Sequence, residues 1–284
     1  MMQRNHFRNL MSLTIVAVAS LSMTAGAQAA LVGELGVLDP TSADGGINPQ
    51  TGVAWAAGDQ YRLAFYTSTT RNATSSNIND YNDFVQGVAA GSTTFSQLGN
   101  GTWKVLGSTS TVSARQNTNT DTNVAVPIYV MDGLTRIAVD SNDMWNGFTG
   151  SSGSNIRIPD ANNNRAVRYS PYLNENGTGD SGGIHGFDIF TGSNSNGTIR
   201  TPLGGPNTNS GGTLISNRGA SNANRSGRVF IRFDNTAQTS QLRFYALSDA
   251  LTVQEAGGAV PEPATATLAL LGLGGLMMRR RRNA

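Results

Sequence analysis

Short runs of strand-forming residues, separated by clusters of glycine, asparagine and serine, constrain this chain more than any other feature of its sequence. Within each run, apolar residues alternate with polar ones, or β-branched and aromatic residues dominate. Many short runs between turn-forming residues are typical of all-β sandwiches and barrels. We therefore predict a mainly β fold of β-sandwich or jelly-roll form, with long Asn/Gly/Ser-rich loops. The runs are 31–38, 61–67, 103–108, 110–115, 126–131, 135–140, 228–233, 242–247 and 251–254.

One stretch has helical rather than strand periodicity. Apolar residues from Ile78 to Val88 recur at helical spacing, which predicts an amphipathic helix over about 78–90, with Gly91 as its end. A second, shorter helix is predicted at 141–148. Further short strands are expected inside the Asn-rich stretch 150–224, around 156–158, 166–169 and 186–190.

The first thirty residues have the three zones of a secretory signal peptide. Arg4 and Arg8 give a basic start, and an apolar run covers residues 10–23. Ala27 and Ala29 then place small side chains at the −3 and −1 positions of a cleavage site. We predict that signal peptidase removes residues 1–29.

The C-terminus has three features in a fixed order. A helix over its apolar run would reach roughly 22 Å, short of the ~30 Å hydrocarbon core of a membrane. Such a run could insert transiently into the inner membrane, because the arginines after it resist translocation and stay on the cytoplasmic side. The features are Pro261, Glu262 and Pro263, the apolar run 264–278, and the cluster Arg279, Arg280, Arg281 and Arg282.

This order of parts resembles the PEP-CTERM sorting signal of Gram-negative bacteria. The resemblance implies that an exosortase, a membrane transpeptidase-like enzyme, recognises and removes the tail. It further implies a cell-surface or extracellular-matrix location, with membrane anchoring if the tail is retained. The chain then divides into the signal peptide, a β-rich extracellular domain over 30–254, a linker over 255–260 and the sorting tail over 261–284.

Most of residues 59–148 is similar to a group of uncharacterised secreted PEP-CTERM proteins from planctomycete-like and related bacteria. The similarity rests on "GDQYRLAFYTSTTRNATSSNINDYNDFVQGVA", "WKVLGSTSTVSARQNTNT" and "VPIYVMDGLTRIAVDSNDMWNGF". In that group a helix with the pattern YN.FV precedes a hairpin with the pattern W..IGST..V.AR.NT and a VPIY strand. The resemblance implies a fold and a location, and it implies no activity.

The charge and cysteine content exclude several function classes. Six of the 20 basic residues lie in the two ends, which leaves 14 against 17 or 18 acidic residues in the processed chain. A mildly acidic domain lacks the basic footprint of a nucleic-acid-binding protein. Because the chain has no cysteine, disulfides and thiolate metal sites are impossible.

The stretch GDSGG at 179–183 matches the sequence around the nucleophile of trypsin-like proteases. In that family the histidine base and the aspartate precede the serine in the chain. Here His185 follows Ser181, and His6 lies in the signal peptide. We therefore interpret GDSGG as a glycine-rich turn, and a convergent Ser181/His185 hydrolase stays open as a third hypothesis.

Two binding sites are weaker candidates. Asp160, Asn162 and Asn164 match the first oxygen ligands of an EF-hand-like calcium loop, but Arg165 replaces the turn glycine and Pro171 the bidentate acid. We expect no cofactor there, with calcium as the alternative.

Aromatic side chains beside Asn-rich loops could bind sugar rings. Trp55 is the best candidate for an exposed, sugar-stacking ring, whereas Trp103 and Trp145 lie among apolar residues and are expected in the core. The sequence thus favours a surface or matrix protein with a structural or interaction role and no catalytic site. The alternative is a lectin-like module that binds extracellular polysaccharide, with or without calcium.

Overall fold

The computed structural model describes residues 30–122, 124–145, 171–179, 188–208, 215–220, 231 and 234–257, with backbone alone for 215–220. The strands are β1 Leu31–Gly33, β2 Gln60–Tyr66, β3 Trp103–Val105, β4 Ile128–Val130, β5 Arg136–Ala138, β6 Asp188–Phe190, β7 Ile215–Ala220, β8 Asp234–Ala237, β9 Arg243–Ser248 and β10 Leu251–Glu255. The α-helices are α1 Ile78–Ala90, α2 Ala114–Asn117 and α3 Ser141–Trp145, and three short 3₁₀ turns cover Glu34–Gly36, Ala43–Gly46 and Leu98–Asn100.

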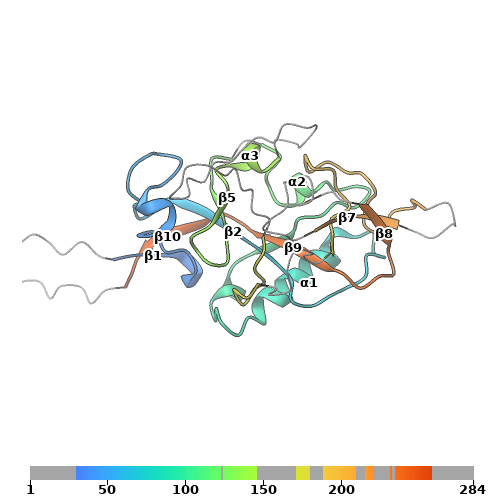
Figure 1. The fold of residues 1–284 in the computed structure, drawn as a ribbon, viewed down its shortest axis with the longest axis horizontal. Helices are drawn as coiled ribbons and strands as arrows, with labels where there is room; N and C mark the ends of the chain where they lie inside the picture. Colours follow the sequence, from blue (N-terminus) through green and yellow to red (C-terminus); the bar gives the residue numbers. More distant parts are fainter. Residues whose placement is uncertain are drawn as a thin grey trace, which may run out of the picture. The chain divides into compact units, whose positions relative to one another are not determined.

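These strands join into one open, mixed sheet, so the prediction of a mainly β fold is confirmed (Figure 1). The path runs β1-β10-β2-β9-β6-β7-β8; β3 pairs with β9, β4 pairs with β2, and β5 pairs with β4. β2 and β9 are antiparallel at its centre, with Ala64 opposite Leu247 and Tyr66 opposite Tyr245. The two packed sheets of a sandwich or jelly roll were predicted, and the described strands instead form a single sheet.

A single sheet can build the core because its central strands are covered on both faces. Every residue of β2 from Tyr61 to Tyr66 is buried, and so is every residue of β9 from Phe244 to Ser248. Successive side chains of a strand point to opposite faces. Apolar runs buried on both sides resemble those of a sandwich in sequence, which is why the sequence alone did not distinguish the two arrangements.

Helix α1 covers one face of this sheet, and its predicted position is confirmed. The side chain of Asn77 caps its start by accepting a hydrogen bond from the backbone N–H of Asn79 at 3.1 Å. The Tyr81 ring on its buried face lies 5.3 Å from the Phe244 ring of β9. Figure 1 shows α1 lying beside β9.

The predicted strand at 110–115 is wrong. Ser113 caps the short helix α2 instead, because its hydroxyl accepts from the backbone N–H of Gln116 while the Gln116 side chain accepts from the backbone N–H of Ser113. This capping box is a local helix-start signal, and it outweighs the strand-like alternation of the sequence. The predicted strand near 186–190 and the start of the helix at 141–148 are present as β6 and α3.

Candidate functional site

The exposed position predicted for Trp55 is wrong. Its side chain is 4% exposed. The indole N–H donates to the backbone carbonyl of Ala43 at 3.4 Å, and the ring lies 6.2 Å from the Tyr129 ring. Since the loop carrying Trp55 folds over the sheet, this ring belongs to the core and cannot stack on a sugar. Trp103 and Trp145 are buried as predicted, at 1% and 3% exposed.

Most of the other predicted site residues lie outside the described part of the chain. Within the described part, no group of three or more His, Asp or Glu side chains could hold a metal ion. Of GDSGG, the described part includes Gly179, which forms an isolated bridge with Leu173. The residues outside are Ala27, Ala29, Asp160, Asn162, Asn164, Ser181, His185, Pro261, Glu262, Pro263 and Arg279–Arg282.

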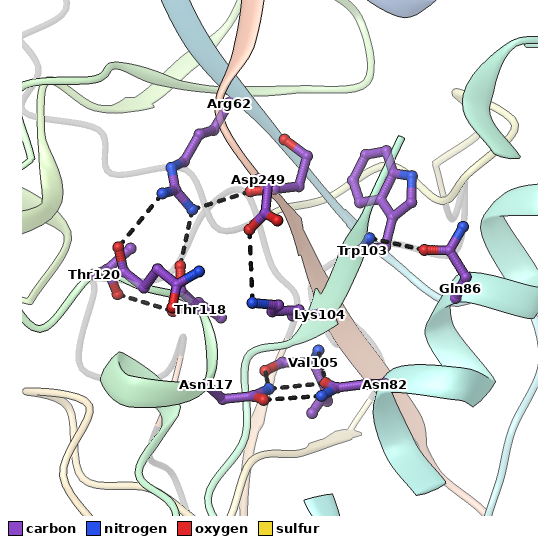
Figure 2. A network of polar contacts seen from close by, with 12 residues as sticks. Arg62, Asn82, Gln86, Trp103, Lys104, Val105, Asn117, Thr118, Thr120 and Asp249 are labelled. Atoms are coloured by element: carbon purple, nitrogen blue, oxygen red, sulfur yellow. Dashed lines mark hydrogen bonds and ion pairs between the residues drawn. The ribbon is translucent and has the colours of Figure 1, made fainter. Parts of the chain in front are cut away.

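A partly buried polar network joins α1 to the edge of β3 (Figure 2). The amides of Asn82 and Asn117 form two reciprocal hydrogen bonds of 2.9 Å. Asn82 Oδ1 also accepts from the N–H of Val105 at 3.0 Å, and Asn117 Nδ2 donates to the Val105 carbonyl at 2.8 Å. One turn along the helix, Gln86 Oε1 accepts from the N–H of Trp103 at 2.9 Å. Side-chain amides therefore satisfy a strand edge that would otherwise present unpaired backbone groups.

Near this network, the Arg62 side chain links the loop at 118–119 to strand β9 through hydrogen bonds (Figure 2). Its guanidinium donates to the backbone carbonyls of Thr118 at 2.9 Å, Ser248 at 3.1 Å and Asn119 at 3.4 Å. Burial lowers the pKa of Arg62, and the charge of Asp249 opposes that shift. An arginine still keeps its charge in proteins. The three carbonyls provide the hydrogen bonds that a buried cation requires.

Asn82, Trp103 and Asn117 belong to the patterns that carry the resemblance of the middle region. All three form hydrogen bonds in this network. We expect Asn82→Ala to lower the free energy of unfolding by about 1–3 kcal/mol, because it leaves the Val105 N–H and the Asn117 amide without that partner. Urea unfolding measures the change. Asn79→Ala, at an exposed position of α1, serves as the control. Equal stability of the two variants would show that the network contributes little.

The first and last segments of the domain form the sheet edge at β1 and β10. Leu31 pairs with Glu255 and Gly33 with Val253 in an antiparallel register. Beyond this pair, the N–H of Ala256 donates to the carbonyl of Ala30 at 2.6 Å. Figure 1 shows β1 and β10 side by side. The segment after the predicted signal peptide is therefore fixed to the segment that leads to the tail.

Side-chain hydrogen bonds of Glu34 and Tyr61 add to this β1–β10 junction. The Glu34 carboxylate accepts from the backbone N–H of Thr252 at 2.8 Å and from its hydroxyl at 3.0 Å, and the Tyr61 hydroxyl donates to the Glu34 carbonyl. A Cβ at Gly33 would lie 2.7 Å from both Leu38 Cβ and the Tyr61 hydroxyl, so the backbone approaches too closely for a side chain. Sequence reasoning missed this site, because Glu34 and Thr252 are 218 residues apart.

An open groove of about 400 Å³ runs along α1. Its helical side is one face of α1 and the residue after it. The opposite side comes from the segment after β2 and from a turn at 174–178. The signal that could have found it is a glycine inside an otherwise regular helix, Gly87. The groove is lined by Ser68, Thr69, Asp83, Phe84, Gly87, Val88, Gly91 and Glu175.

A buried acid, Glu175, lies in the wall of the groove opposite α1 and is hydrogen-bonded to Ser68 in the same wall. Glu175 is 3% exposed. Its carboxylate accepts hydrogen bonds from the Ser68 N–H at 2.9 Å, from the Ser68 hydroxyl and from the Asn176 amide at 3.1 Å. The groove wall therefore has a fixed position, set by a carboxylate whose partners are neutral donors.

Comparison with known families identifies the C-terminal tail. Residues 259–282 match the family model of the PEP-CTERM protein-sorting motif, and no curated protein matches the chain. The motif marks an exported protein that an exosortase processes and sorts to the cell surface. In the described part of the chain no helix has the length and hydropathy to cross a membrane, and the predicted span 264–278 lies outside that part. The similarity of the middle region to a planctomycete-like group stays a prediction.

Proposed function

We propose that this protein is a surface or extracellular-matrix domain with a structural or interaction role, held to its destination by the end that carries β1 and β10. The observation that supports this is the β1–β10 junction. It brings the start of the domain beside the residues that lead to the sorting motif. Signal peptidase cutting after Ala29 would leave Ala30 as the first residue, already bonded to Ala256.

The link between the domain and the sorting motif is short. The last residue of β10, Glu255, precedes Pro261 by six positions, which an extended chain spans in at most about 20 Å. An enzyme acting at the PEP residues therefore works close to the folded sheet edge.

Deleting residues 259–284 tests the proposed location. We expect the shortened protein to fold, because the last strand of the sheet ends at Glu255, and to leave the cytoplasm, because the predicted signal peptide is kept. It should be missing from the cell surface and matrix fractions and accumulate in the periplasm or the medium. Unchanged surface levels would overturn the proposal that the tail decides the location.

The junction itself gives a second expectation. Glu34→Ala removes two hydrogen bonds to a carboxylate and should lower the free energy of unfolding by about 1.5–3 kcal/mol. The rate of amide hydrogen exchange should rise in β10, because the Thr252 N–H loses the carboxylate to which it donates. Glu255→Ala, at an exposed position of the same edge, is the matched control and should change neither quantity measurably. Similar effects of the two variants would contradict the role given to Glu34.

The second candidate function, a lectin-like module, needs a site other than the buried Trp55. The groove along α1 is the observation that favours it, because it is open and lined by both apolar and hydrogen-bonding groups. The absence of catalysis stays a prediction. Incubation with peptide, ester and glycan substrates tests it, and turnover lost in Ser181→Ala would establish the hydrolase hypothesis instead.

A further inference from the structure

We infer that the groove along α1 binds an uncharged sugar ring of an extracellular polysaccharide, with Gly87 as its floor. The inference deepens the second candidate function and rests on it. Four features of the groove carry the argument: an unexplained glycine, an apolar wall, a free carboxylate and the absence of basic residues from its lining.

Gly87 stands in the interior of α1, where glycine is a poor helix former. Such a glycine is usually required by close packing. Here no packing requires it, because a Cβ built at Gly87 would have no neighbouring atom within 4 Å. The missing side chain opens the groove instead. Gly91, one turn later, continues the same open strip of backbone.

The apolar side of the groove comes from Phe84 and Val88, which are both partly buried. The Phe84 ring is fixed by an edge-on contact with Phe244 at 5.7 Å and by the Arg71 guanidinium at 5.9 Å from its centroid. A rigid aromatic wall of this kind suits the C–H face of a pyranose ring, since it gives contact area at little cost in side-chain entropy.

The polar side of the groove accepts hydrogen bonds and carries negative charge. Asp83 is exposed at the rim, and its carboxylate has no hydrogen-bond or ion-pair partner in the described part of the chain. Glu175 lies opposite, and none of the eight lining residues is basic. Hydroxyl groups of a neutral sugar could donate to the exposed Asp83 carboxylate, whereas the buried Glu175 carboxylate contributes charge but is already hydrogen-bonded. A uronic-acid polymer would instead be repelled.

The size of the groove agrees with a small ligand. Its volume of about 400 Å³ lies in the lower part of the range for small-molecule sites, roughly 300–1,000 Å³. We therefore expect the site to recognise one or two sugar rings within a longer chain. Because the groove is open to solvent, the rest of the polymer could extend away from it.

Affinity electrophoresis of the sorted chain, purified from cells, tests the proposal. Gels containing a neutral polymer (dextran, mannan or galactan) should retard the protein, and gels containing alginate, a uronic-acid polymer, should not. Retardation by the neutral polymer should persist at high salt, because an uncharged ligand is not screened. No retardation by any of the neutral polymers, or retardation by alginate, would overturn the proposal. Loss of this retardation at high salt would show that charge attraction rather than recognition of an uncharged sugar holds the protein in the gel, and would overturn the proposal equally.

A Cβ at Gly87 would meet no atom of the fold within 4 Å. We expect the longer side chain in Gly87→Leu to extend into the groove, so binding should fall at least tenfold while the melting temperature stays equal or rises. Asn79→Leu places the same side chain on an exposed part of α1 and should bind like the wild type. Asp83→Asn should weaken binding about tenfold. Wild-type binding by Gly87→Leu would refute the site.

The amount of each variant at the cell surface is measured in the same cells. Normal surface levels of a protein that binds no glycan would reject the sugar site alone, whereas normal binding with failed sorting would reject the proposed location alone.

Discussion

Above pH 10 the domain is expected to lose stability steeply, by about 4 kcal/mol between pH 8 and pH 11. Three fully buried tyrosines cause this loss. Burial raises the pKa of Tyr61 and of Tyr129 far above the ordinary value of 10, and it raises the pKa of Tyr81 to about 12. Nearby carboxylates add to the first two shifts, since Glu34 lies near Tyr61 and Asp44 accepts from Tyr129.

The sign follows from proton binding in the two states. Above pH 10 the unfolded tyrosines release their protons, while the folded ones keep them. Each buried tyrosine therefore costs about 1.4 kcal/mol of stability per pH unit in this window. The stability that the three phenols provide is fully present below pH 10. Few other side chains belong to types that change protonation between pH 8 and pH 11, because the chain has one lysine, Lys104, and no cysteine.

Urea unfolding at several pH values, together with tyrosinate absorbance, measures this effect. In Tyr61→Phe or Tyr129→Phe the slope of stability against pH above 10 should fall by about a third. A slope in either variant equal to that of the wild type would show that these phenols ionise without unfolding. A difference in tyrosinate absorbance between the wild type and either variant that appears before the unfolding transition would show the same.

The second large effect is expected at Trp103. Trp103→Ala should lower the free energy of unfolding by about 3–5 kcal/mol, the usual cost of truncating a buried aromatic side chain. The indole is 1% exposed and lies 4.8 Å from the Phe65 ring, and its N–H donates to the Leu98 carbonyl at 2.9 Å. Its removal would leave a cavity beside the central strands.

Thermal and urea unfolding report this change. Trp103→Phe retains most of the ring volume and should recover more than half of the lost stability. Lys104→Ala changes the neighbouring residue of the same strand, whose side chain forms a partly exposed ion pair with Asp249 at 3.8 Å. We expect about 0–1 kcal/mol from that change. A small loss in Trp103→Ala would mean that the site collapses around the missing ring.

The elements that sequence reasoning found are those encoded by local periodicity. The helix over 78–90 and the central strands β2 and β9 have clear apolar patterns and lie where they were predicted. The error at 110–115 arose from a local signal that was overlooked. Ser113 and Gln116 have the spacing of a capping box, and the structure uses it.

The candidate sites were much harder to predict, because they depend on residues distant in the chain. Glu34 reaches Thr252 across 218 residues, and Glu175 reaches Ser68 across 107. No local pattern encodes such pairs. Trp55 was misplaced for the same reason, since its flanking glycine and alanine residues resemble an exposed loop, and its burial comes from the contact with Tyr129.

Mapping both ends of the native protein by mass spectrometry, after cell fractionation, tests the central claim most directly. We predict a surface or matrix protein that begins at Ala30 and ends near Pro261, Glu262 and Pro263, with the domain intact between them. A chain that keeps Arg279–Arg282 and remains in the inner membrane would contradict it, because the domain would then be a permanent membrane protein.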